Sequence, residues 1–179
     1  MTIQRTISPV DGSVYVERTL ASPVQIEAAL ESARLAQRAW RDVPISERAA
    51  ILGRFCDAFA SHAEAIAEEL SWQMGRPIRY SPSEVRGTLE RARHMIAIAP
   101  AALADIDVGP KSGFTRFLRR EPLGVVFTVA AWNYPYLIAV NSVVPALMAG
   151  NVVVLKHSAQ TPLCAERFEE CVREAGLPE

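Results

Sequence analysis

Hydrophobic and polar positions follow two different periods along the chain. Between residues 20 and 103 apolar side chains recur every three or four positions, which predicts a series of amphipathic helices with polar outer faces. Between residues 125 and 131 every side chain except that of Thr128 is apolar, as in a strand buried on both faces of a parallel sheet. The pattern therefore predicts a helical region that is followed by a parallel α/β unit.

Capping signals predict where the helices begin and end. Ser22, Pro23 and Gln25 form a capping box with proline in the first turn. We expect this helix to run to about Trp40, where its apolar periodicity ends. Similar signals predict three more helices, which begin at Ser46, at Ser61 with Glu64, and at Ser81 with Glu84. We expect the helix from Ser61 to end at Gly75 and the helix from Ser81 to end near Leu103.

Two other segments are expected to be extended. The first residues predict a short hairpin with Asp11 and Gly12 as its turn. The segment from 113 to 132 is expected to be extended, and its first part carries arginine and phenylalanine side chains on both faces. Because each face of this ribbon carries both polar and apolar side chains, it fits an exposed arm better than a core strand.

The last part of the chain predicts a strand–helix–strand–helix unit. Its second strand is "VVVL", the helix between the strands spans about 135–149 with Pro145 kinking or splitting it, and the last helix starts at 161. Asn133 follows the first strand and Lys156 the second, at the sheet edge where ligands bind in such folds. The amide could donate to a developing oxyanion or satisfy a turn, and the ammonium could hold a ribose or phosphate or be solvated.

Composition narrows the function classes. The chain has 179 residues, a net charge of -1 and 22% charged residues, which is ordinary for a single globular domain and gives no sign of a nucleic-acid partner. No apolar run reaches the ~20 residues of a membrane span, and no secretory signal pattern opens the chain. Three cysteines without metal-ligand spacing predict no metal site and a reducing, cytoplasmic setting.

Other familiar catalytic patterns are absent from the sequence. It contains no glycine-rich dinucleotide fingerprint, P-loop, serine-hydrolase elbow or zinc-protease helix motif. His157 has no orienting partner nearby, so we expect it to be structural or exposed. None of the cysteines has the surroundings of an activated nucleophile.

Two ordered motifs resemble the aldehyde dehydrogenase superfamily. "EPLGVVFTVAAWNYP" is followed by "VPALMAGNVVVLKHSAQTP", and the match extends over residues 121–178. The resemblance implies an α/β fold in which an N-terminal helical region precedes the first half of a Rossmann-like parallel sheet. It divides the chain into a hairpin and helices of the cofactor domain (1–107), a strand arm of the oligomerisation type (108–123) and the first half of the Rossmann-like domain (124–179).

The resemblance also implies a reaction and assigns residues to it. In that family a cysteine thiolate attacks an aldehyde, a hydride passes to NAD or NADP, and water activated by a glutamate releases the carboxylic acid. Asn133 would be the side-chain donor of the oxyanion hole. The implied cofactor contacts are Val129, Ala130, Ala131, Trp132, Lys156, Ser158 and Ala159, and the implied substrate-tunnel residues are Tyr134, Ile138 and Asn141.

Departures from the family pattern refine these expectations. Ala159 stands where members that prefer NAD often carry a glutamate, so repulsion of a 2′-phosphate is lost and we expect NADP to be accepted. The wording "LKHS" is most similar to succinate-semialdehyde dehydrogenases, which points to a semialdehyde substrate.

The nucleophilic cysteine and the general-base glutamate of the family match no residue of this chain. We therefore expect the N-terminal part of a longer, homo-oligomeric enzyme, with weak or no cofactor binding and no activity of these 179 residues alone. The alternative is a short non-catalytic nucleotide-binding or assembly module derived from the family.

Overall fold

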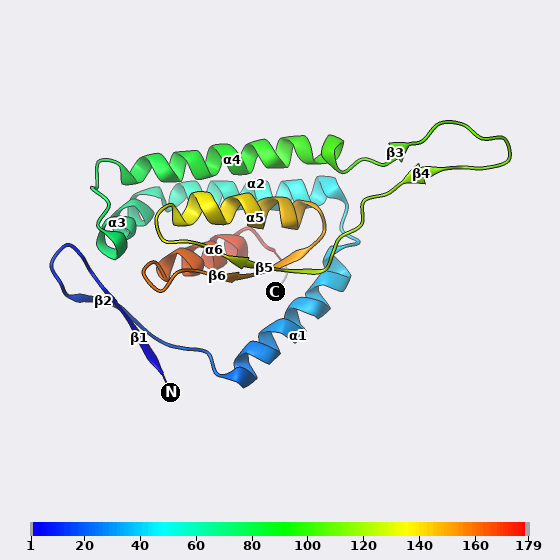
Figure 1. Cartoon of the computed structure of the whole chain (residues 1–179). Coiled ribbons are helices and arrows are strands. Elements are labelled where there is room, and N and C mark those ends of the chain that lie inside the picture. The colour runs from blue at the N-terminus through cyan, green and yellow to red at the C-terminus, as the bar shows by residue number, and fades with distance from the viewer. Residues whose placement is uncertain (1, 178–179) are drawn as a thin grey trace.

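Helices cover both faces of a small parallel sheet in this protein (Figure 1). The computed structural model describes residues 2–177. Its elements are β1 (Ile3–Ile7), β2 (Val14–Thr19), α1 (Pro23–Trp40), α2 (Ile45–Ser61), α3 (Ala63–Met74), α4 (Ser81–Ala102), β3 (Ile106–Asp107), β4 (Phe117–Leu118), β5 (Val125–Val129), α5 (Pro135–Met148), β6 (Val152–Lys156) and α6 (Leu163–Glu174).

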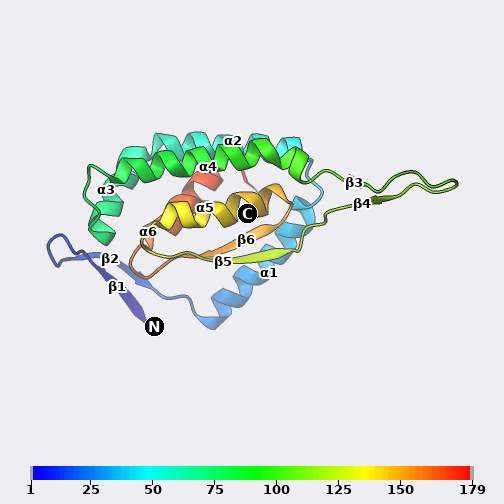
Figure 2. The ribbon, with the colours of Figure 1, turned by 45° about the horizontal axis from the view of Figure 1, so that its top comes forward.

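The parallel pair β5–β6 is the part of the fold that positions the candidate site. Its register runs from Val125 opposite Val152 to Val129 opposite Lys156, so both strands end together. Helix α5 is the crossover between them and packs on one face, and α1 crosses the other face (Figure 2). The predicted strand–helix–strand order is confirmed, although β5 ends at Val129 instead of residue 131 and Pro145 lies within one continuous helix.

Aromatic side chains form the centre of the hydrophobic core between α2, α5 and α6. Phe59 lies edge-on to Tyr136 with ring centroids 5.1 Å apart, and Phe55 stacks on Phe168 at 5.7 Å. All four side chains are almost fully buried. Trp40 fixes the end of α1 to this core, because its indole N–H donates to the Leu147 carbonyl at 3.0 Å.

The helix extents follow the apolar periodicity, but only one predicted capping box forms. The Ser22 hydroxyl accepts from the Gln25 backbone, and the Gln25 side chain accepts from the Ser22 backbone. The caps predicted at Ser46, Ser61 and Ser81 are wrong, because the residues that cap α2, α3 and α4 are Pro44, His62 and Tyr80, which make no side-chain cap bond. Gly75 ends α3 in the left-handed conformation, as predicted.

Other hydrogen bonds explain the misplaced caps. The Pro44 carbonyl already accepts from the amides of Glu47 and Arg48 at 3.0 Å, so α2 begins before Ser46. The Ser61 hydroxyl donates back to the Ala58 carbonyl at 2.7 Å. The Ser81 hydroxyl instead contacts Ser71 at 3.1 Å.

Two antiparallel hairpins lie outside this core. The first is predicted correctly, but the connection between β1 and β2 closes between Ser8 and Ser13, so it is longer than an Asp11–Gly12 turn. The second is an arm that projects from the body (Figure 1); its strands pair Ile106–Asp107 with Phe117–Leu118, and one isolated antiparallel bridge joins Lys111 to Phe114 between them. The segment expected to be extended over 113–132 thus contains two separate strands, β4 and β5, and the exposed arm expected in its first part is confirmed. Within residues 2–177, no helix combines the length and the apolarity needed to cross a membrane.

Candidate active site

The carboxyl ends of β5 and β6 bring together the residues that the sequence singled out. Lys156 is the last residue of β6, and its carbonyl accepts from the Ala130 amide at 3.1 Å just beyond β5. Asn133 lies in the short segment between β5 and α5, and Tyr134 is the N-cap of α5. The predicted neighbourhood of an amide and an ammonium at one sheet edge is therefore present in the structure.

The backbone of Asn133 is held, while its side-chain amide has no partner among the residues that the structure describes. The Arg76 guanidinium donates to the Asn133 carbonyl at 2.6 Å and stacks over the Tyr134 ring at 4.6 Å from its centroid. Among residues 2–177, the Asn133 side chain makes no hydrogen bond, and it is exposed. The turn is thus held through the carbonyl group, and the amide N–H groups are available to an incoming oxygen.

Arg76 and Glu84 were missed as site residues by sequence analysis. Glu84 is fully buried, pairs with Arg76, and accepts from the backbone amides of Tyr136 at 2.9 Å and Leu137 at 3.3 Å. Burial raises the pKa of Glu84, while Arg76 and the two amides oppose that rise. The sequence pattern predicts Glu84 in a capping box, but its position beside Val85 on the buried face of α4 is the signal of an internal partner.

Lys156 has the exposure that a cofactor contact needs. Its side chain is exposed, and no acidic side chain within the described part of the chain lies at ion-pairing distance. An ammonium group in this state can donate to ribose hydroxyls or phosphate oxygens.

The loop after Lys156 is tied to the N-terminal hairpin. The Ala159 carbonyl accepts from the Gln4 side chain and from the Thr6 hydroxyl, the latter at 2.8 Å, so the loop is fixed while the Ala159 side chain stays exposed. The Ser158 hydroxyl oxygen accepts from the Gln160 amide at 3.2 Å. Its own O–H remains able to donate to a ligand.

The expected cofactor floor is only partly exposed. Val129 is 62% exposed and Trp132 is 54% exposed, and Ala131 is exposed as well. These apolar groups fit the flat faces of a dinucleotide. Ala130 is 3% exposed and its amide is already bonded to the Lys156 carbonyl, so its side chain does not contribute to the floor.

The three predicted tunnel residues lie along the first turns of α5. Ile138 and Asn141 are three residues apart and so share one face of α5, and Tyr134 is the N-cap residue just before the helix. Asn141 is exposed, and its amide donates to the Leu137 carbonyl at 2.7 Å and accepts from Arg91 at 3.1 Å. Ile138 is partly buried against the core.

None of the three thiols has the properties of a nucleophile. All three cysteines are buried and free. Burial raises the pKa of Cys56 to about 11 and that of Cys171 to about 12, and it raises the pKa of Cys164 further. A thiol in this state is protonated near neutral pH and unreactive, as the sequence predicted.

His157 is structural, and the exposed alternative is wrong. The side chain is 7% exposed and stacks on Phe168 with ring centroids 6.3 Å apart. Neither ring nitrogen has a hydrogen-bond partner within the described residues. Burial, with a smaller contribution from neighbouring Lys156, lowers the pKa of His157 to about 4.

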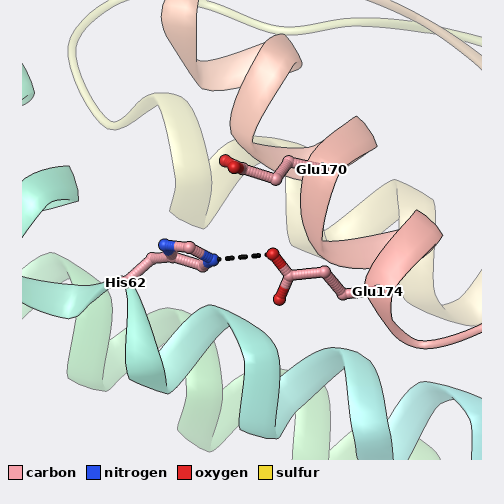
Figure 3. Close-up of side chains that lie close together, drawn as sticks. All are labelled: His62, Glu170 and Glu174. Atoms are coloured by element: carbon pink, nitrogen blue, oxygen red, sulfur yellow. Dashed lines mark hydrogen bonds and ion pairs between the residues drawn. The ribbon is translucent and has the colours of Figure 1, made fainter.

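A second group of polar side chains lies far along α6 from this edge. The ligand-type atoms of His62, Glu170 and Glu174 lie within 4.8 Å of one another (Figure 3). A hydrogen bond and an ion pair account for the group, because His62 contacts Glu174 at 3.0 Å and Glu170 accepts from Arg167 at 2.5 Å. We therefore assign no cation to it.

Known proteins resemble this chain over nearly its whole length and not only in the two motifs. The family model described as "Aldehyde dehydrogenase family" matches residues 2–179. The chain belongs to the aldehyde dehydrogenase family. Within the family, it is 35% identical over 173 residues to the 3,6-anhydro-alpha-L-galactose dehydrogenase of Streptomyces coelicolor, a match that covers 97% of this chain and 35% of that relative. It is 34% identical over 174 residues to the betaine aldehyde dehydrogenase of Agrobacterium fabrum, with coverage of 97% and 35%.

Solved aldehyde dehydrogenase structures show the same fold over nearly the whole chain. An NAD-dependent benzaldehyde dehydrogenase from Corynebacterium glutamicum superposes with a TM-score of 0.90 at 31% identity, covering 99% of this chain and 39% of that one. A succinic semialdehyde dehydrogenase from Streptococcus pyogenes in complex with NADP+ gives 0.90 at 27% identity, covering 98% and 38%. The chain therefore spans little more than a third of the length of these relatives.

Proposed function

We propose that this chain supplies the oxyanion donor and part of the cofactor site of an NAD(P)-dependent aldehyde dehydrogenase that oxidises an aldehyde to a carboxylic acid. The observation that carries the proposal is that Asn133, whose amide has no hydrogen-bond partner within residues 2–177, and exposed Lys156 both lie at the carboxyl ends of two paired parallel strands. Attack on an aldehyde turns its carbonyl oxygen into an oxyanion. A pre-oriented amide that donates to this oxygen lowers the barrier, by roughly 3–4 kcal/mol in other enzymes.

The remaining residues of the edge fit a dinucleotide. Lys156 would donate to the adenosine ribose, Ser158 could add a hydroxyl donor, and Val129 with Trp132 would pack against apolar faces. When bound, the nicotinamide accepts the hydride. Ala159 carries no carboxylate that would repel a 2′-phosphate, so the site accepts NADP as well as NAD.

The substrate class follows from the same edge. Tyr134, Ile138 and Asn141 would line the approach of the aldehyde along α5. A succinic semialdehyde dehydrogenase is among the structures similar to this chain, which supports a semialdehyde as one candidate substrate. Free cysteines support a cytoplasmic location, since a reducing compartment keeps thiols unpaired.

The chain alone is predicted to be inactive, because its three thiols are buried and protonated. The purified 179-residue chain, mixed with succinate semialdehyde and either cofactor, should form no reduced cofactor. Formation of one equivalent of NADH or NADPH per chain in a rapid-mixing experiment would contradict this prediction.

A second candidate is a non-catalytic assembly module. The projecting β3–β4 arm favours it, since Phe114, Phe117 and Leu118 on or beside that arm are exposed and could join a second chain. The coding DNA beyond the codon for Glu179 discriminates the two. A continuing reading frame with a cysteine and a glutamate in the family's motifs supports the enzyme, and a stop codon supports the module.

A further inference from the structure

The Arg76 side chain connects a buried carboxylate to the backbone of the candidate oxyanion donor. One guanidinium nitrogen, Nη1, pairs with the Glu84 carboxylate, and Nη2 donates to the Asn133 carbonyl at 2.6 Å. The guanidinium also lies over the Tyr134 ring. Because a guanidinium is a rigid planar fork, fixing one of its nitrogens on Glu84 fixes the direction of the other.

Glu84 holds the opposite side of the same segment. Its Oε1 atom accepts from the amides of Tyr136 and Leu137, in the first turn of α5, at 2.9 and 3.3 Å. The N-cap residue of α5, Tyr134, supplies no side-chain cap of its own. Glu84 therefore takes the place of a cap from a different helix, and its negative charge lies at the positive end of the α5 dipole.

The pair is buried too deeply to be a surface ion pair. The exposed fraction of the side chain is 10% for Arg76 and 0% for Glu84. Removing two charges from water is costly, and apolar residues would often stabilise such a place equally well. Stability alone is thus a weak reason for the pair, whereas Arg76 holds the Asn133 carbonyl and Glu84 holds the first turn of α5 that follows it.

We propose that Arg76 and Glu84 are positioning residues that fix the turn carrying Asn133 and so aim its amide at the carbonyl oxygen of the aldehyde. The inference rests on the proposed role of Asn133 as oxyanion donor. Such a donor is effective only when its place is set before the reaction, since a displacement of about 1 Å can cost roughly a hundredfold in rate.

Backbone dynamics of the chain test the positioning directly. Arg76→Lys keeps a cation beside Glu84 but cannot reach both Glu84 and the Asn133 carbonyl with a fixed fork. We expect the amide order parameters of Trp132, Asn133 and Tyr134, measured by NMR relaxation, to fall from about 0.85 to below about 0.6. The matched control is Arg167→Lys, since Arg167 is 22% exposed and pairs with Glu69 away from this turn; its substitution should leave the three amides unchanged.

A folded Arg76→Lys protein whose three amides stay as ordered as in the wild type would overturn the proposal. If that variant does not fold, the double variant Arg76→Gln with Glu84→Gln replaces both charges together and leaves neither one buried alone. The same fall in order parameters is expected for it, and an unchanged turn would again overturn the proposal.

Kinetics separate this inference from the proposed function. In the aldehyde-oxidising enzyme that carries these residues, Arg76→Lys should lower kcat at least tenfold and leave the KM for the cofactor within about twofold. A normal kcat in Arg76→Lys together with a low kcat in Asn133→Ala would refute positioning by Arg76 and keep the proposed function. A normal kcat in Asn133→Ala would refute the proposed function, and the order parameters would still decide whether Arg76 holds the turn.

Discussion

At the scale of single residues, His157 links burial to the pH dependence of stability. Its imidazole is 7% exposed, and its pKa is lowered to about 4 from an ordinary 6.5. The unfolded chain therefore takes up a proton first as the pH falls below about 6.5, which favours unfolding. The stabilisation is complete above that pH and is lost progressively toward pH 4.

We expect this titration to lower the free energy of unfolding by about 2 kcal/mol between pH 7 and pH 5. Urea unfolding of the wild type and of His157→Phe at both pH values measures it, because the other titrating groups are common to both proteins. The variant should lose about 2 kcal/mol less than the wild type. Equal losses in the two proteins would show that His157 does not titrate in this way.

Ala159 tests the cofactor assignment at the same scale. Ala159→Glu places a carboxylate on the exposed loop after β6, close to the proposed ribose position. We expect the affinity for NADP to fall about fivefold more than that for NAD, since two exposed like charges repel by roughly 1 kcal/mol. The measurement is the dissociation constant of each cofactor from the proposed enzyme that would carry these residues. Ala159→Gln is the uncharged control. An equal loss for both cofactors would argue against the assignment.

At the scale of elements, the capping boxes separate what a local pattern predicts from what the fold uses. Ser22→Ala removes the one box that forms and should lower the free energy of unfolding by about 1 kcal/mol. Ser46→Ala changes an exposed serine inside α2 and should have an effect of a few tenths of a kcal/mol. Thermal or urea unfolding compares them, and equal effects would mean that the Ser22 box does not stabilise α1.

The same contrast explains how much the sequence could predict. Helix and strand positions followed from apolar periodicity, which depends on burial and is visible locally. The role of Glu84 did not, because its partners are Arg76, before α4, and the amides of α5, more than fifty positions later. The sequence shows the same serine and glutamate at capping spacing in both cases: when the glutamate side chain caps its own helix, and when it is buried and caps another helix.

At the scale of the whole molecule, the chain contains only part of the fold that its relatives have. The chain spans 35% of the relatives from Streptomyces coelicolor and Agrobacterium fabrum. Within the described residues, the parallel sheet consists of β5 and β6 alone. An apolar groove of about 660 Å³ runs between α1, β6 and α6 and is lined by residues such as Ala33, Val153 and Phe168.

Asn133 and Lys156 were predictable as a pair because β5, which precedes Asn133, and β6, which ends with Lys156, end at the same edge of the sheet.

The kcat of Asn133→Ala tests the central claim most directly. It is measured for aldehyde oxidation in the proposed enzyme that would carry these residues, beside Asn141→Ala, whose amide already bonds Leu137 and Arg91. The account predicts that Asn133→Ala lowers kcat by about 10²–10³ with little change in the cofactor KM, while Asn141→Ala mainly changes the aldehyde KM. A kcat of Asn133→Ala within threefold of the wild type would contradict the account.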